Sequence, residues 1–275
     1  MTPRIGTQLI LETENLVKLL YVGDSGALLG PLFIASPFLM EIKGFNVHIW
    51  GQLLIDGLSR EPDIDVKHMS SWEAFREFPR TAEAMAEYDV ILLSDIEADV
   101  LLFYPEFYTP AEYGRDVAMP NRIEAIKKYV EKGGALIMAG SWVSFAGRYG
   151  HAGWRKTAIA DALPVGILVE DDRVEVPEGV KVKALNPNHP VMSRIPWDEC
   201  PPFLGYNKTS LKNGAQLLAT IGNEEDPFIV VWDYKEGRVM AFTSDPCPHW
   251  GINFQRWDYY QKFWVQAVRW LALDR

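Results

Sequence analysis

Short apolar runs that end at small or polar residues are the dominant pattern along this chain. The clearest are residues 16–22 (LVKLLYV), 88–93 (YDVILL) and 135–139 (ALIMA). A nearly continuous apolar run of this length is typical of a strand buried on both faces of a parallel sheet. Residues 64–68 form a further candidate strand. The pattern therefore predicts a sheet of parallel strands.

A helical pattern directly precedes one of these strands. Asn121 can cap a helix in which Glu124 is the third residue, and Gly133-Gly134 ends the pattern before the strand at 135–139. The apolar stripe of this helix consists of Ile123, Ile126 and Val130. A helix, a glycine stop and a buried strand together form the repeating unit of an α/β fold.

Residues 45–58 fit two patterns at once. Their first five residues alternate between apolar and polar as a strand does, whereas the residues from Trp50 onward repeat at helical spacing. Both interpretations stay open on the sequence.

The second half of the chain predicts additional, antiparallel strands. Short alternating segments separated by proline and glycine occupy residues 174–176, 180–182, 216–221, 228–234 and 237–243. A helix with an aromatic stripe is predicted from about residue 256 to residue 273. Because no repeat and no long linker interrupts the chain, residues 1–275 are expected to form a single domain.

The longest uncharged stretch, residues 25–40, lies between Asp24 and Glu41. Its sixteen residues are too few for a membrane span, and its glycines and prolines would break a helix. We expect a loop with a short apolar turn that covers a neighbouring part of the protein. Residues 1–16 lack the pattern of a signal peptide, so a cytoplasmic protein without a membrane partner is expected.

The charge and composition of the chain limit the classes of partner and cofactor that it is expected to bind. The formal net charge of −10 and the absence of a dense Lys/Arg run argue against nucleic acid as a partner. The two cysteines, Cys200 and Cys247, suit a reducing compartment. The five histidines show no metal-ligand spacing and no glycine-rich phosphate motif follows the first strand, so neither a metal nor a cofactor is expected.

The candidate chemistry lies where the strands end, because ligands of open parallel sheets bind beyond the carboxyl ends of their strands. Asp245 and His249 could perform acid–base work, with Asp95 or Glu97 as a second carboxylate. The alternative for His249 is a packed histidine in a proline-rich loop. Further candidate ligand-binding residues at strand ends are Asp24, Ser25, Gly140, Ser141, Trp142 and Trp250. For Asp24 and Ser25, capping of local structure is an equally good interpretation.

Several blocks, in order along the chain, resemble proteins described as putative glutamine amidotransferases, relatives of the class I glutamine amidotransferases and of the ThuA-like trehalose-utilisation proteins. The blocks are YDVILLSDIEADVLLFYPE, NRIEAIKKYVEKGGALIMAGSWVSFAGRYG, LPVGILVEDDRVEVPEG, NPNHPVMSRIP, FLGYN and AFTSDPCPHWG. The resemblance implies a flavodoxin-like three-layer α/β sandwich with additional strands in the C-terminal half. The site residues that it implies are Asp95, Gly140, Ser144, Gly147, Tyr206, Asn207, Asp245, His249 and Trp250.

Three functions follow from these observations. The first is a small-molecule enzyme, a hydrolase or isomerase, acting on a sugar-related substrate with Asp/His acid–base chemistry. The second is a non-catalytic ligand-binding or regulatory protein on the same scaffold. The third and weakest is a true glutamine amidotransferase using Cys247, because the residues after strand 135–139 include no cysteine where the class I enzymes carry their nucleophile.

Aromatic residues between the candidate strands suggest a surface for self-association into a homo-oligomer. They are Phe103, Tyr104, Phe107, Tyr108 and Tyr113. The alternative is a loop that folds back on its own domain, and the sequence gives that alternative slightly more weight.

Overall fold

A computed structural model describes residues 16–36, 39–109 and 116–272. Its centre is an eight-stranded sheet with the strand order β11-β14-β15-β16-β8-β7-β1-β6. The strands are β1 (Val17–Gly23), β6 (Ile64–Met69), β7 (Val90–Ser94), β8 (Ala135–Ala139), β11 (Val182–Ala184), β14 (Gln216–Ile221), β15 (Asp226–Tyr234) and β16 (Gly237–Phe242). The five strands from β16 to β6 are parallel, and the other three extend the sheet in antiparallel pairing.

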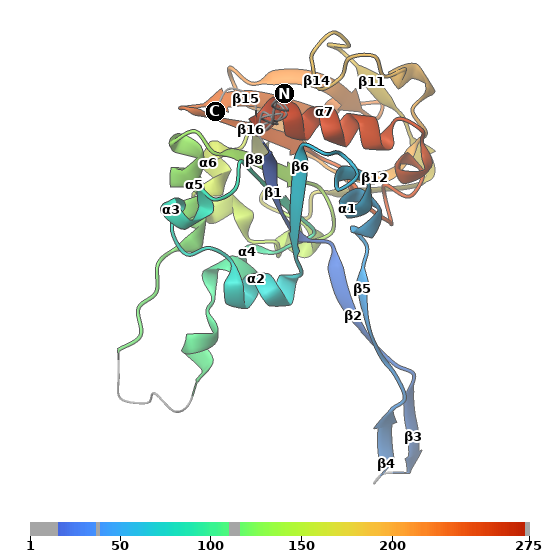
Figure 1. The fold of residues 1–275 in the computed structure, drawn as a ribbon. Coiled ribbons are helices and arrows are strands. Elements are labelled where there is room, and N and C mark those ends of the chain that lie inside the picture. Colours follow the sequence, from blue (N-terminus) through green and yellow to red (C-terminus); the bar gives the residue numbers. More distant parts are fainter. Residues whose placement is uncertain (1–15, 37–38, 110–115, 273–275) are drawn as a thin grey trace, which may run out of the picture.

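Helices cover both faces of this sheet (Figure 1). Alternate side chains of β1 show the two faces, since Leu19 and Tyr21 belong to one apolar core and Leu20 and Val22 to the other. The first core includes residues of α1 (Gln52–Leu58) and α7 (Tyr260–Ala272). The second includes residues of α2 (Ser71–Glu77), α3 (Ala82–Met85), α4 (Ala98–Leu102), α5 (Arg122–Glu131) and α6 (Ile159–Ala162). The predicted three-layer α/β sandwich is confirmed.

Local sequence explains where these elements begin. Asn121 Oδ1 accepts hydrogen bonds from the backbone amides of Ile123 (3.0 Å) and Glu124 (3.1 Å), so the predicted start of α5 is confirmed. A full capping box between Ser70 and Glu73 starts α2. Residues 45–58 contain both predicted elements, one after the other: the strand β5 ends at Ile49, and the helix α1 begins at Gln52.

Two further strand pairs and several helical turns lie outside the eight-stranded sheet. The antiparallel pairs are β9 (Val165–Ile167) with β13 (Thr209–Leu211), and β10 (Arg173–Val180) with β12 (Phe203–Asn207). The 3₁₀ turns are η1 (Pro105–Tyr108), η3 (Arg148–Gly150), η4 (Trp154–Lys156), η5 (Trp197–Glu199) and η6 (Phe254–Arg256). The additional strands predicted for the C-terminal half are therefore present.

The loop predicted for residues 25–40 is wrong. A two-stranded ribbon, residues 25–36 and 39–49 and here called the arm, projects from the body of the molecule (Figure 1). Its strands are β2 (Ser25–Leu29) paired with β5 (Phe45–Ile49), and β3 (Leu32–Ser36) paired with β4 (Leu39–Ile42). Its glycines and prolines are typical of a loop, but β5, the partner strand of β2, lies beyond residue 40.

None of the helices in the described part of the chain is long and apolar enough to cross a membrane.

Candidate functional site

Polar residues lie just after the ends of four neighbouring parallel strands, at one edge of the sheet. Asp24 follows β1, Asp95 follows β7, Ser141 lies two residues after β8 and Asp245 three residues after β16. The chain passes from β1 to β6 on one side and then crosses to β7 on the other, which opens a crevice between the ends of β1 and β7. Asp24 and Asp95 lie on the two sides of that crevice.

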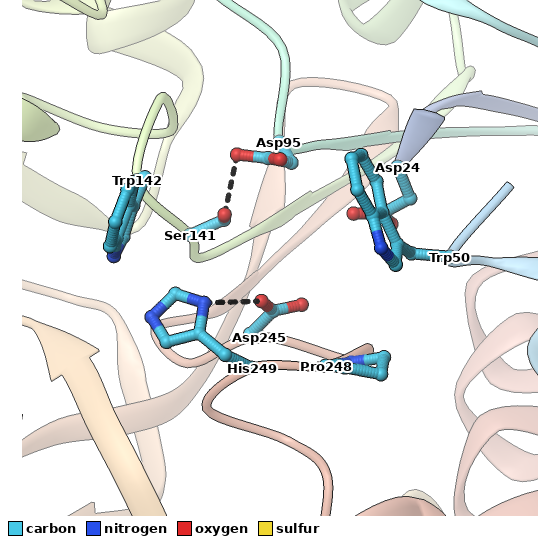
Figure 2. A pocket seen from close by; sticks show the side chains of 8 residues that line it. All are labelled: Asp24, Trp50, Asp95, Ser141, Trp142, Asp245, Pro248 and His249. Atoms are coloured by element: carbon cyan, nitrogen blue, oxygen red, sulfur yellow. Dashed lines mark hydrogen bonds and ion pairs between the residues drawn. The ribbon is translucent and has the colours of Figure 1, made fainter. Parts of the chain in front are cut away.

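A pocket of about 560 Å³ lies at this edge, within the range of about 300–1,000 Å³ common for small-molecule sites. Its lining consists of Asp24, Trp50, Asp95, Ser141, Trp142, Asp245, Pro248 and His249 (Figure 2). All three residues predicted as catalytic, Asp95, Asp245 and His249, are therefore neighbours in space.

The backbone at the two crevice carboxylates is unusual. Asp24 and Asp95 have φ values of +44° and +45°, in the left-handed region that side chains other than glycine rarely adopt. Such conformations cost about 1–3 kcal/mol each and cluster at functional sites. The strand ends also approach closely, because a Cβ added at Gly23 would lie 1.7 Å from the carbonyl oxygen of Ser94.

The pKa values of two of the carboxyl groups, those of Asp24 and Asp245, lie well above the ordinary value for aspartate. Burial, together with the negative charge of Asp95, raises the pKa of Asp24 to about 7. Burial, together with the charges of Asp24 and Asp95, raises the pKa of Asp245 well above its usual range. Asp24 accepts a short hydrogen bond from the hydroxyl of Tyr21, and Asp245 Oδ1 accepts one from the amide of Cys247 at 2.8 Å. These carboxyl groups therefore lose their protons at higher pH than ordinary aspartates do.

Asp95 is tied to the loop after β8. The hydroxyl of Ser141 donates a hydrogen bond of 2.5 Å to Asp95 Oδ1 (Figure 2). The amide of Val143 donates to the same oxygen at 3.3 Å. The amide of Asp95 in turn donates to Ser144 Oγ at 3.2 Å. Burial raises the pKa of Asp95, and the bond from Ser141 opposes this shift.

His249 stands at the rim of the pocket with about half of its side chain exposed. Its Nδ1 lies 4.0 Å from Asp245 Oδ2, and its Nε2 lies 3.8 Å from Glu175 Oε2. Partial burial lowers the pKa of His249 although Glu175 and Asp95 oppose the shift. A neutral imidazole, able to accept a proton, therefore faces a carboxyl group that can donate one.

Indole rings form two walls of the pocket. Trp142 packs its ring against the edge of His249, with ring centroids 5.0 Å apart, and its Nε1 donates to Glu175 Oε1 at 3.1 Å. Trp50 lies on the opposite side in Figure 2. Flat apolar walls combined with convergent polar groups are the usual composition of a small-molecule site.

Two of the predicted ligand-binding residues shape the backbone beside the pocket. Asn207 Oδ1 accepts from the amide of Ser141 (2.9 Å), while its Nδ2 donates to the carbonyl oxygen of Ser141 (3.0 Å). A Cβ at Gly140 would lie 2.5 Å from the carbonyl oxygen of Thr243, so this close approach requires glycine. Asn207 and Gly140 lie outside the pocket lining and position Ser141.

The other predicted residues lie farther from the ligand space. Ser25 Oγ accepts from the amide of Ser71 (3.2 Å) at the base of the arm, and the hydroxyl of Tyr206 donates to Asp226 (2.8 Å). Trp250 is fully buried, and its Nε1 donates to Glu175 Oε2 at 2.9 Å. Glu97 is exposed at the start of α4 and does not line the pocket.

Sequence reasoning missed the residues that support the pocket from the segment 171–179. Glu175 accepts from both Trp142 and Trp250 and faces His249. Asp172 accepts from the amides of Ala146 and Gly147 (2.9 Å each), and burial raises the pKa of its carboxyl to about 6. Both acids belong to the block DDRVEVPEG, which carried the family resemblance but offered no motif that assigns a role.

Trp50 was also missed as a wall of the pocket. It lies between β5 and α1, within the segment that fitted both a strand and a helix. The turn that separates those elements brings its indole to the crevice, and the amide of Trp50 donates to the carbonyl oxygen of Asp24 at 2.8 Å. Only the pairing of the arm strands reveals this placement.

The cysteines are poorly suited to nucleophilic chemistry. Both are buried, and burial raises the pKa of Cys200 to about 12 and that of Cys247 well above its usual range.

Within the described residues, Asp24, Asp245 and Cys247 could hold a metal ion, since their candidate ligand atoms lie within 4.8 Å of one another. The spacing of these residues along the sequence gave no signal of that grouping.

The family model for putative glutamine amidotransferases matches residues 41–273, which include most of the sheet and nearly all of the pocket. The chain belongs to this putative glutamine amidotransferase family. The predicted fold, of the class I glutamine amidotransferase-like type, is confirmed with it. Residues 140–144, which follow the central strand β8, include no cysteine.

Solved structures support the assignment. The chain is 32% identical to "Cytoplasmic Protein STM3548 from Salmonella typhimurium", with a TM-score of 0.82 and coverage of 93% of this chain and 99% of that one. It is 34% identical to "Cytoplasmic Protein STM1381 from Salmonella typhimurium LT2", with a TM-score of 0.81 and the same coverages. No curated protein matched the chain significantly.

A more distant relationship shows the fold alone. A putative ThuA-like protein from Parabacteroides merdae ATCC 43184 is 13% identical, with a TM-score of 0.52 and coverage of 94% of this chain and 90% of that one.

Proposed function

We propose that this protein is an enzyme that transfers protons on a sugar-related small molecule, as a hydrolase or an isomerase. One observation carries the proposal: the imidazole of His249, whose pKa is lowered, faces the carboxyl of Asp245, whose pKa is raised, within one pocket. Opposite pKa shifts in neighbouring groups are the usual arrangement for an acid and a base that work together near neutral pH.

The roles follow from the protonation states. Neutral His249 would act as the general base, and its half-exposed position at the rim leaves the ring accessible to a bound ligand. Protonated Asp245 would act as the general acid from the floor of the pocket. Asp95 would hold the hydroxyl of Ser141, which can then accept a hydrogen bond from a ligand hydroxyl.

The composition of the pocket supports a polyhydroxylated ligand. Carboxyl groups and the hydroxyl of Ser141 can pair with several ligand hydroxyls, while Trp50 and Trp142 offer flat surfaces for the apolar face of a sugar ring. Among the described residues, the pocket lining includes no lysine or arginine to pair with a phosphate group, which disfavours phosphorylated substrates.

Glutamine hydrolysis is the weakest candidate. A thiolate nucleophile requires a lowered pKa, and burial raises the pKa of both Cys200 and Cys247. Ser141 donates its hydroxyl proton to a carboxylate and would need a positioned base with greater proton affinity to become a nucleophile.

A binding protein without catalysis is the second candidate, and one distance favours it. The 4.0 Å between His249 Nδ1 and Asp245 Oδ2 is longer than a hydrogen bond, so the two groups do not form a tight dyad before a ligand arrives. A ligand-sensing or regulatory member of the family would need the same pocket without the proton transfer.

A thermal-shift screen with sugars, keto-sugars, amino acids and nucleotides tests the proposal. We expect stabilisation by a sugar or keto-sugar, loss of this stabilisation in His249→Ala, and its retention in the matched control His151→Ala, whose side chain lies outside the pocket. NMR of the stabilising compound with the protein then separates turnover from binding. Stabilisation that persists in His249→Ala would contradict the placement of the site.

Location follows from the relatives. Both Salmonella structures are titled as cytoplasmic proteins, and we infer the same compartment for this chain, in agreement with its two free cysteines.

A further inference from the structure

The arm leaves an unusually large apolar surface uncovered. Eleven of its large apolar residues are at least 37% exposed. They are Leu28, Leu29, Leu32, Phe33, Ile34, Leu39, Met40, Ile42, Phe45, Val47 and Ile49. Together they expose roughly 1,000 Å², whereas the largest apolar patch of a typical monomer covers about 300–600 Å².

Both faces of the arm are uncovered. Leu28 and Leu29 are consecutive strand residues, so they point to opposite faces, yet they are 53% and 65% exposed. The same holds for Phe33 and Ile34, at 50% and 65%. A ribbon that exposes apolar side chains on both faces has no packing partner among the described residues of its own chain along this length.

The arm also lacks the protection that exposed strands usually carry. Natural edge strands are kept apart by charged residues, especially lysine. Between residues 25 and 49 the charged Lys/Arg/Asp/Glu residues are Glu41 and Lys43, which pair with each other. The arm is therefore a neutral, apolar extension of a chain whose net charge is −10.

A second apolar group lies on the body, on the side toward which the arm extends. Trp72 of α2 is 47% exposed, and Phe107 and Tyr108 of η1 are 44% and 66% exposed. Phe75 of α2 contacts Tyr108, with ring centroids 6.4 Å apart, so α2 and η1 form one surface. In Figure 1 the arm, α2 and the turn at 105–108 all lie on the side away from α7.

We propose that the arm is a dimerisation device, which packs on the α2–η1 surface of a second copy of this chain while the partner's arm packs on the same surface here. Such a two-fold exchange is closed, because each copy supplies one arm and one receiving surface. If one face of each arm, roughly 500 Å², docks on a receiving area of equal size, the exchange would bury about 2,000 Å² in total, within the range of about 1,200–2,000 Å² for stable interfaces.

Geometry and charge favour a second copy over a membrane. Twelve residues from Ser25 to Ser36 in extended conformation span roughly 40 Å, enough to reach across a neighbouring subunit. One lysine in the arm offers little attraction to anionic headgroups, and the acidic body would be repelled by them. The arm also begins after Asp24 and ends before Trp50, so a docked arm would hold two pocket residues in place.

Removal of the arm tip is the direct test. Leu29 pairs with Phe45, and the amide of Gly30 donates to the carbonyl oxygen of Gly44 at 2.9 Å. Deleting residues 31–43 therefore joins Gly30 to Gly44 as a two-residue Gly-Gly hairpin turn and leaves β2 and β5 intact. The control is Leu185→Glu, an exposed apolar residue at the opposite end of the sheet order.

Light scattering after size-exclusion chromatography should give twice the chain mass of 31.2 kDa for the full chain and for Leu185→Glu, and the single-chain mass for the shortened arm. A full chain that stays monomeric at all concentrations, or a dimer that survives the deletion, would overturn the proposal. So would arm-dependent sedimentation with phosphatidylcholine–phosphatidylserine vesicles without self-association.

Cross-linking tests the receiving surface separately. Both native cysteines are buried, so a mixture of Met40→Cys and Tyr108→Cys chains should form an oxidised heterodimer. Replacing Tyr108→Cys by Leu185→Cys should abolish that product. Equal cross-linking of both pairs would refute docking on the α2–η1 surface.

Discussion

At the scale of single residues, the site consists of groups whose protonation is set by burial. Asp24, Asp95 and Asp245 are crowded at the ends of adjacent strands, and burial is the first cause of the raised pKa of each. His249 is shifted in the opposite direction by the same cause. Burial of these groups therefore lowers the free energy of unfolding, and binding of a ligand or a proton in the pocket can raise it again.

Asp24→Asn should stabilise the protein at alkaline pH. The pKa of Asp24 is about 7 in the folded chain, against about 3.9 when unfolded. Between these values the folded state binds more protons, so the free energy of unfolding falls as pH rises from about 4 to about 7. The substitution removes this loss and should raise the free energy of unfolding at pH 8 by roughly 1–3 kcal/mol.

Urea unfolding at pH 3.5 and at pH 8 measures this effect. The difference between Asp24→Asn and the wild type should become small at the acid pH, where the carboxyl group is mostly protonated in the unfolded state as well as in the folded state. Asp198→Asn, at an exposed position in η5, serves as the control and should show no comparable gain. An equal difference at both pH values would contradict the assigned shift.

At the scale of elements, the side chain of Arg122 in α5 links α2 and α4 by hydrogen bonds. Its side chain is fully buried at the start of α5 and donates to backbone carbonyl oxygens. The acceptors belong to Ala74, Phe75, Val100, Leu101 and Phe103, in α2 and around the end of α4. The guanidinium also lies 4.0 Å from the ring centroid of Tyr104.

Arg122→Met should cost about 3–5 kcal/mol of stability, because it leaves several buried carbonyl oxygens without donors. The matched control is Arg80→Met, since Arg80 lies 5.2 Å from the centroid of the same Tyr104 ring but is paired with Glu106 at the surface. The control should cost less than about 1 kcal/mol. Denaturant titration of both variants checks the comparison, and equal losses would contradict this role of Arg122.

Elements defined by local pattern could be predicted from the sequence. The parallel strands β1, β7 and β8 and the start of α5 depend on apolar runs and caps within about ten residues, and they appear at the predicted positions. The arm could not be predicted in this way, because its ladder joins residues up to 24 positions apart, such as Ser25 and Ile49.

The candidate site likewise contains residues that local sequence pattern could locate and residues that depend on long-range pairing. Strand ends located Asp24, Asp95, Ser141 and Asp245, because the carboxyl ends of parallel strands share one edge. Trp50 and Glu175 reach the pocket region from β-ribbons whose pairing is long-range, so their contribution became visible only in the fold. Trp250 was expected to face a ligand but is buried, with its indole hydrogen-bonded to Glu175.

At the scale of the whole molecule, the arm couples stability to self-association. If two copies exchange arms, the melting temperature should rise with protein concentration, because mass action favours the folded dimer over unfolded monomers. The variant that lacks residues 31–43 should melt at a temperature independent of concentration. Calorimetry across a hundredfold range of concentration measures both, and a concentration-independent transition in the full chain would contradict the dimer.

The aromatic residues at 103–113, which the sequence suggests as a self-association surface, lie in different surroundings in the structure. Phe103, Phe107 and Tyr108 are exposed, whereas Tyr104 is buried against Arg122, and Tyr113 lies outside the described residues. The surface that projects farthest is the arm, which the sequence pattern suggested to be a covering loop.

The central claim is that neutral His249 and protonated Asp245 share one pocket, and an NMR pH titration of the five histidines tests it most directly. The His249 resonance, assigned by its loss in His249→Ala, should titrate with a pKa below the ordinary value of about 6.5. It should also sense ionisation of the buried carboxyl cluster at higher pH, and Asp245→Asn should alter that second inflection. A His249 that remains positively charged at neutral pH, with a single inflection unaffected by Asp245→Asn, would contradict the account.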